Sequence, residues 1–292
     1  MTGYENAITL KDVTKHYEGF MLDHVSFNVP KGSIMGFIGQ NGAGKTTTIR
    51  SLLNITDIDE GGIQILGLDH IKHEQEIKTR IAVVFDELPF HDIFNPKDMA
   101  RIFEGLYPEW DNAVYMQYLE RFQLPVKKKI GQFSKGMKMK LQIACALSHN
   151  AELLVMDEAT TGLDPVVRDE ILHIFMEYLK DGERSILMSS HITSDLEKIA
   201  DSVTFIDKGR ILLTGYKDDI LEKHGILKCA KDKLSEIAPE DIISIRVNNY
   251  GAEVMVPDRE NAGYRYRDAV IDPVSLDDVM LYYVHKGEGE WS

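Results

Sequence analysis

One segment of the sequence combines the residue types that bind phosphate. Gly39-Gln40-Asn41-Gly42-Ala43-Gly44-Lys45-Thr46 follows the pattern GxxxxGK with Ser or Thr next, and Thr47 comes directly after it. The glycines let backbone amides turn toward a phosphate, the lysine reaches the β- and γ-phosphates of a nucleotide, and the Thr46 hydroxyl binds Mg²⁺. The alternative is a glycine-rich turn that only caps a helix. The residues expected to hold the nucleotide are Gly39, Asn41, Gly42, Ala43, Gly44, Lys45, Thr46 and Thr47.

Two adjacent carboxylates end an apolar run further along the chain. Asp157 and Glu158 directly follow residues 153–156. We expect Asp157 to hold Mg²⁺ through water and Glu158 to polarise the water that attacks the phosphate. Acidic residues are common at strand ends, so this pair is a weak signal alone and gains its value from the phosphate loop.

The elements that must position these residues alternate between strands and helices over the first two thirds of the chain. This alternation favours an α/β fold, and short apolar runs are typical of a buried, mostly parallel sheet. The predicted strands are Ile34–Ile38, Ile81–Phe85, 153–156, Ser185–Ser190, 203–206 and 210–213. The phosphate loop follows the first strand and precedes a helix predicted over 45–54, which indicates a P-loop NTPase (RecA-like) core.

Two other regions differ from this core. Helical periodicity punctuated by prolines predicts an α-helical subdomain over 88–147, inserted into a core of 1–87 and 148–216, so that 1–216 form one nucleotide-binding domain. Residues 217–292 are expected to form a small α+β C-terminal domain. Asn248-Asn249-Tyr250-Gly251 is a good hairpin turn, and Ser275 with Asp278 has capping-box spacing.

Further motifs stand in a fixed order around the first two. In Phe133-Ser134-Lys135-Gly136-Met137, Ser134 precedes Asp157 by 23 residues, and Thr161-Gly162-Leu163-Asp164 follows Glu158. His191 lies 33 residues after Glu158, and Tyr17 lies 22 residues before Gly39. With these motifs, residues 5–216 resemble the ATP-binding-cassette ATPases, whose signature segment corresponds to 133–137 here.

The resemblance implies an ATPase that works as a head-to-tail dimer. ATP and Mg²⁺ would lie between the phosphate loop of one subunit and the signature segment of the other. Ser134 and the amide of Gly136 would then contact the γ-phosphate across the dimer. The second subunit would be another copy of this chain or a paralogous ATPase subunit.

The resemblance also implies roles for residues around the nucleotide. His191 would sense the γ-phosphate and help to hold Glu158 and the attacking water. Tyr17 would stack on the adenine ring. A histidine without these neighbouring motifs would more often be structural.

Two motifs depart from the family pattern. Asp86 follows the strand Ile81–Phe85 where the family usually has a glutamine. A carboxylate there would still ligate Mg²⁺, together with Thr46 and Asp157, although the change could weaken the link to a membrane partner. In the signature segment, Lys135 and Met137 are also unusual, while the two residues expected to touch phosphate remain.

A lysine cluster surrounds the signature segment. Six lysines and no acidic residue lie within 127–140: Lys127, Lys128, Lys129, Lys135, Lys138 and Lys140. An ordinary solvated helix face explains such a cluster. The alternative is that Lys135 faces the partner's ATP and that 127–129 face another subunit or an anionic surface.

Composition limits the partners. With 33 Lys+Arg against 47 Asp+Glu, the formal charge is −14, so nucleic acid is not an expected partner and direct binding to an anionic bilayer is disfavoured. Cys145 and Cys229 are the only cysteines, which excludes a disulfide scaffold and a cysteine-rich zinc site and favours a reducing compartment. No apolar run approaches the roughly 20 residues of a membrane span. Together with the absence of such a run, the resemblance implies a peripheral protein on the cytoplasmic side of the membrane, attached through a separate transmembrane permease.

These observations favour the ATPase subunit of a transporter. Phe85-Asp86-Glu87 and the segment 133–138 resemble bacterial exporters of peptides or toxins and antibiotic-responsive systems, and aromatic residues within 90–94 are candidates for docking the permease. The alternative is a soluble cassette ATPase that acts on ribosomes or DNA. Only one phosphate loop is present, and the 89 residues from Lys45 to Ser134 leave no room for a long coiled coil. A P-loop kinase would not need the signature segment.

Overall fold

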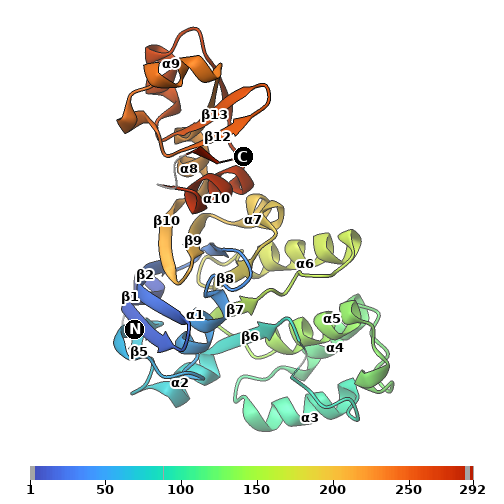
Figure 1. Ribbon diagram of the computed structural model, residues 1–292. Helices are drawn as coiled ribbons and strands as arrows, with labels where there is room; N and C mark the ends of the chain where they lie inside the picture. Colours follow the sequence, from blue (N-terminus) through green and yellow to red (C-terminus); the bar gives the residue numbers. More distant parts are fainter. Residues whose placement is uncertain (1–3, 88, 287–289, 292) are drawn as a thin grey trace.

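A six-stranded sheet forms the centre of the first 216 residues (Figure 1). The structure, a computed structural model, describes residues 4–87, 89–286 and 290–291. The strand order is β10-β9-β3-β8-β7-β6, and all neighbours are parallel except β10 with β9. The strands are β3 (Ile34–Ile38), β6 (Ile81–Phe85), β7 (Leu153–Asp157), β8 (Ser185–Ser190), β9 (Ser202–Asp207) and β10 (Arg210–Tyr216). Every residue of β3, β7 and β8 is buried, which confirms the strands predicted from continuous apolar runs.

A second, antiparallel sheet lies beside the first and was not predicted. Its order is β2-β1-β4-β5, with β1 (Asn6–Tyr17), β2 (Phe20–Pro30), β4 (Glu60–Ile65) and β5 (Leu68–Asp69). Side chains of β2 alternate between buried and exposed, as expected where one face of a strand is solvated. Phe27 of β2 stacks on Phe37 of β3 with ring centroids 5.2 Å apart, so one core joins the two sheets.

Short helices connect the strands of the core, and a separate group of helices follows β6. The core helices are α1 (Lys45–Leu52), α2 (Glu74–Arg80), α6 (Pro165–Tyr178) and α7 (Thr193–Ile199). The second group is α3 (Pro96–Leu106), α4 (Asn112–Arg121), the 3₁₀ turn η1 (Ile130–Gln132) and α5 (Lys135–Ala146). Asn95, Asp111 and Ser134 cap α3, α4 and α5 with their side chains. Figure 1 shows this group beside the β6 edge of the sheet.

The last part of the chain forms a third sheet of order β14-β11-β13-β12-β15 at the opposite end of the molecule from α3 (Figure 1). Its elements are α8 (Lys217–Lys223), β11 (Gly225–Cys229), η2 (Lys231–Glu236), η3 (Pro239–Asp241), β12 (Ser244–Asn248), β13 (Gly251–Val256), α9 (Arg259–Arg265), β14 (Val270–Pro273), α10 (Leu276–Val284) and β15 (Glu290–Trp291). The predicted hairpin joins β12 to β13, and the predicted capping box of Ser275 and Asp278 begins α10; both are confirmed.

Helix α10 attaches this sheet to the nucleotide-binding part. The Thr193 hydroxyl of α7 donates to Asp277 at 2.6 Å, and the Leu276 amide donates to Glu197 of α7 at 2.6 Å. The contact reaches α7 directly after the segment that carries His191. Among the helices of the described residues, none is long and apolar enough to span a bilayer.

Candidate functional site

The phosphate loop connects the carboxyl end of β3 to the first turn of α1. Glycine is required at Gly39, because a Cβ there would lie 2.5 Å from the carbonyl oxygen of Ile206. Gly42 and Gly44 have φ values of +81° and +116°, which side-chain-bearing residues rarely adopt. No side chain caps α1, so its first amides and the positive end of its dipole are available to an anion at the loop. This geometry fits a nucleotide phosphate.

Lys45 lies inside the loop that it follows. Its side chain is 5% exposed, and Nζ donates to the carbonyl oxygens of Gly39 at 2.6 Å and Gln40 at 3.2 Å. The third neighbour of Nζ is Oε1 of Glu158 at 3.0 Å. The predicted phosphate-binding lysine and the predicted base are therefore in direct contact.

Glu158 is held by its backbone and by its side chain. It has φ +54°, and its amide donates to the Ser189 hydroxyl at 3.0 Å, which turns the chain just after β7. Oε2 accepts from the Thr161 hydroxyl at 2.7 Å and lies 2.7 Å from Nδ1 of His191. Burial alone would raise the pKa of Glu158, but Thr161, Lys45 and His191 together lower it. The carboxylate is thus kept ionised next to the phosphate loop.

The predicted magnesium ligands differ in their surroundings. The Thr46 side chain is exposed at the start of α1, and Asp157 is buried with Oδ1 accepting from the Ser189 hydroxyl at 2.7 Å. A hydroxyl and a carboxylate oxygen suit Mg²⁺, which usually takes one or two protein ligands and completes its shell with phosphate and water. Among the described residues, no group of three or more His, Cys, Asp or Glu side chains could hold a metal ion by itself.

Asp86 lies at the same edge of the sheet but faces another partner. Phe85 and Asp157 are paired in register on the parallel strands β6 and β7. Asp86, the residue after Phe85, therefore follows the end of β6 next to Asp157. Its Oδ1, however, accepts from Nζ of Lys135 at 2.7 Å. Its role as a magnesium ligand therefore stays a prediction.

The two residues at the ends of the site are placed differently. His191 follows β8 and touches Glu158, as expected from its position in the sequence. Tyr17 ends β1 and is 46% exposed, with its ring centroid 6.5 Å from that of Phe20. An exposed ring of this kind is available for stacking on a base, while Gly44 packs beneath Phe20.

The signature segment does not join this cluster within the chain. Ser134 caps α5 and accepts from the Met137 amide at 3.2 Å, and it is exposed, whereas Gly136 is half-buried. In the described residues, no hydrogen bond or ion pair links Ser134 or Gly136 to the phosphate loop. Within the described part of the chain, the signature segment therefore has no direct polar bond to Lys45.

Two positioning residues were missed by sequence reasoning. Ser189 supports both Asp157 and Glu158, and the signal was the polar pair that ends the apolar strand β8. Gln142 is buried in α5 and bonds both the amide and the carbonyl of Phe85. No local pattern distinguishes Gln142 from other polar helix residues.

Three lysines of the cluster around the signature segment form ion pairs. Lys135 pairs with Asp86, Lys138 with Asp92 at 3.2 Å, and Lys140 with Glu170 at 2.7 Å. The acidic partners come from other segments, which the local charge count did not reveal. These ion pairs do not decide between a solvated helix face and a surface that meets the ATP of a partner subunit, so both stay predictions.

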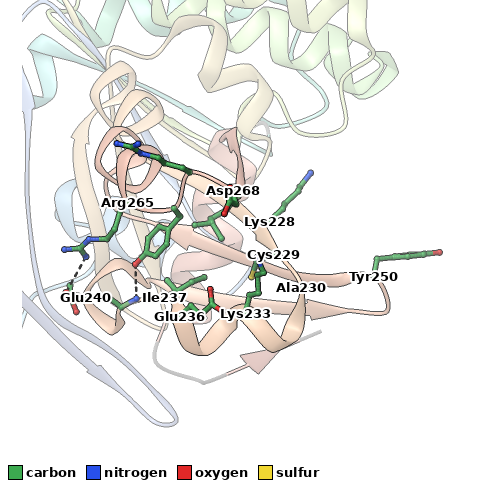
Figure 2. A pocket seen from close by; sticks show the side chains of 15 residues that line it. Lys228, Cys229, Ala230, Lys233, Glu236, Ile237, Glu240, Tyr250, Arg265 and Asp268 are labelled. Carbon is green, nitrogen blue, oxygen red and sulfur yellow. Dashed lines mark hydrogen bonds and ion pairs between the residues drawn. The ribbon is translucent and has the colours of Figure 1, made fainter.

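A cavity of about 920 Å³ lies far from these motifs, in the C-terminal part (Figure 2). Figure 2 shows Cys229, Lys233, Glu236 and Asp268 around it, and none of the predicted site residues lines it. The lining mixes cationic with anionic side chains, which selects no single ligand charge. The cavity is therefore not part of the candidate nucleotide site.

Known proteins with similar sequences and structures support the assignment of a nucleotide-binding site. A family model described as ABC transporter matches residues 22–161. The chain is 38% identical over 208 residues to the bacitracin transport ATP-binding protein BcrA of Bacillus licheniformis, covering 70% of this chain and 68% of that protein. It is 32% identical to the ABC transporter ATP-binding protein NatA of Bacillus subtilis (strain 168), covering 74% and 92%. A solved ATP-binding subunit of an ABC transporter superposes with TM-score 0.67 at 28% identity, covering 73% and 91%.

Proposed function

Because this chain belongs to the ABC transporter family and is an ATP-binding subunit with ATPase activity, we propose that it hydrolyses MgATP to power export through a separate membrane permease. The observation that carries the proposal is the position of Glu158. Its carboxylate lies 3.0 Å from Lys45 and 2.7 Å from His191, at the mouth of the phosphate loop. A base held at that point addresses the γ-phosphate of a nucleotide bound in the loop.

Each side chain of the site has a task in this reaction. Backbone amides of the loop and Lys45 bind the β- and γ-phosphates, and Tyr17 stacks on adenine. Glu158 orients the attacking water and accepts its proton, while His191 holds the carboxylate in place. Mg²⁺, when bound, neutralises charge on the phosphates, and the residues that would hold it are Thr46 and Asp157, with Asp86 nearby.

A second ATPase subunit is needed to complete the site. Ser134 and Gly136 lie at the start of α5, and among the described residues neither forms a hydrogen bond or ion pair with the phosphate loop of its own chain. The start of a helix offers amides and a positive dipole end to an anion. In a head-to-tail dimer, this surface covers the γ-phosphate bound by the other subunit, which is a second copy or a paralogous chain.

The proposed partner in the membrane is a permease of an export system. BcrA is named as a bacitracin transport protein, and this relationship favours an antibiotic or peptide as cargo. Between β6 and α3, Ile93 is 69% exposed while Phe90 and Phe94 are half-buried. An apolar side chain presented on a packed aromatic base suits docking of an amphipathic helix of the permease. This attachment would place the chain on the cytoplasmic side of the membrane.

Membrane recruitment tests the proposal. The full chain is expressed with and without a candidate permease taken from its genomic neighbours, and membranes are separated by flotation. We expect the chain in the membrane fraction only when the second protein is present. Ile93→Asp should reduce this recruitment at least tenfold. The control is Ile55→Asp, which changes an isoleucine of the nucleotide-binding core that is 60% exposed and should not reduce recruitment. Recovery of the chain with ribosomes, and not with membranes, would refute the transporter function.

A further inference from the structure

Two residues that depart from the family pattern contact each other. Asp86 and Lys135 are 49 positions apart in the sequence, yet Lys135 Nζ donates to Asp86 Oδ1 at 2.7 Å. The negative charge gained after β6 is therefore matched by the positive charge gained in the signature segment. The pair links the edge of the sheet that carries Asp157 to the first residue of α5.

Two hydrogen bonds next to this ion pair hold helix α5 against the end of strand β6. Gln142 of α5 is 3% exposed; its Nε2 donates to the carbonyl oxygen of Phe85 at 3.0 Å, and its Oε1 accepts from the Phe85 amide at 3.2 Å. These two bonds hold the end of β6 against α5 whether or not the neighbouring ion pair is formed. Changing Asp86 or Lys135 should therefore leave the fold intact.

The ion pair itself is easily broken. The side chains of Lys135 and Asp86 are 47% and 42% exposed, and pairs with this exposure change an equilibrium by about two- to fivefold. Lys135 also follows Ser134, the residue proposed to contact the ATP of the other subunit. A triphosphate carries more negative charge than one carboxylate, so it competes effectively for the ammonium group.

We propose that Lys135 exchanges Asp86 for the ATP phosphates bound by the second subunit, and that this exchange frees Asp86 to approach the Mg²⁺ of its own chain's ATP. The inference rests on the head-to-tail dimer proposed above. Docking on one nucleotide then strengthens metal binding at the other. Because such coupling is reciprocal, metal binding by Asp86 also releases Lys135 for docking.

Single substitutions should act in opposite directions on dimer formation. They are made in the full chain carrying Glu158→Gln, so that ATP is not consumed, and ATP-dependent dimerisation is measured by analytical ultracentrifugation. Lys135→Gln should weaken the dimer at least fivefold, because a phosphate contact is lost. Asp86→Asn should strengthen it about two- to fivefold, because Lys135 no longer has a competing partner.

The same two substitutions should have the reverse effect on the metal. With Mg²⁺ titrated against ATP binding in calorimetry, Lys135→Gln should lower the half-saturating Mg²⁺ concentration about two- to fivefold, and Asp86→Asn should raise it by a similar factor. The matched control is the Lys138–Asp92 ion pair, which joins the same helix to the same connecting region at 3.2 Å. Lys138→Gln and Asp92→Asn should leave both measurements within twofold of the parent.

The outcomes separate this inference from the proposed function. If the Glu158→Gln parent does not dimerise with ATP, the proposed head-to-tail function fails. If the parent dimerises but Asp86→Asn and Lys135→Gln shift dimerisation in the same direction, the pair is only a structural clamp and the exchange is refuted. Equal responses of the Lys138–Asp92 controls would refute it as well.

Discussion

Replacing Glu158 by glutamine separates nucleotide binding from hydrolysis. The carboxylate has three short contacts, with Lys45 at 3.0 Å and with Thr161 and His191 at 2.7 Å. Glutamine has nearly the same shape but cannot accept the proton of the attacking water. Loss of a general base lowers turnover by about 10²–10⁴-fold, or about 2.7–5.4 kcal/mol in the activation barrier.

Without ATP, the same substitution should destabilise the fold, whereas bound ATP should stabilise it. Lys45 is 5% exposed and loses its anionic partner Glu158, although it keeps two carbonyl acceptors. We expect the free energy of unfolding to fall by about 1–3 kcal/mol, the cost of a buried polar group that is left poorly paired. Bound phosphate restores the negative charge, so ATP should raise the melting temperature of the variant more than that of the parent.

Phosphate release and thermal unfolding with and without ATP measure these effects. The matched control is Glu170→Gln. Glu170 lies on α6 and forms an ion pair with Lys140 at 2.7 Å. This control should retain turnover within about twofold of the parent, as is usual for a surface substitution away from the reacting groups. Turnover of Glu158→Gln within tenfold of the parent, with ATP still bound, would show that another group activates the water.

Three further changes test separate parts of the structure. Gly39→Ala brings a methyl group 2.5 Å from a strand carbonyl and should weaken fluorescent ATP binding at least tenfold, whereas Gly62→Ala meets no atom within 4 Å and should not. Ser275→Ala removes the cap of α10 and should lower the free energy of unfolding in urea by about 1 kcal/mol; an unchanged midpoint would contradict the capping role. Hydrogen bonding from Arg80 lowers the pKa of Glu152 against the opposing effect of burial, so this pair stabilises the fold above pH 4.5 and loses its effect as pH falls through the lowered value. Glu152→Gln should therefore cost about 1 kcal/mol or less at neutral pH and progressively less in acid, measured by melting temperature; a cost that grows in acid would reverse the assigned sign.

Local signals in the sequence were sufficient for several elements. The phosphate loop between β3 and α1 requires glycines and a lysine at fixed spacing, so its pattern is readable without tertiary information. The hairpin between β12 and β13 and the cap of α10 are likewise encoded by neighbouring residues. The antiparallel sheet of β1, β2, β4 and β5 was missed, since β1 pairs with β4 across more than 40 intervening residues.

The site shows the same division between local and long-range information. The sequence by itself determined which residue types are present: a phosphate loop, a pair of carboxylates after a buried strand, a histidine after the next strand, and the membership in a family of ATPases. Only the tertiary structure decided which of them meet. Lys45, Glu158 and His191 converge because β3, β7 and β8 are parallel and end at one edge of the sheet, while Asp86 turns to Lys135 because Gln142 fixes α5 against β6. These contacts depend on strand order and helix packing. Both bring together residues that are far apart in the sequence, and no local pattern predicts that such residues will meet.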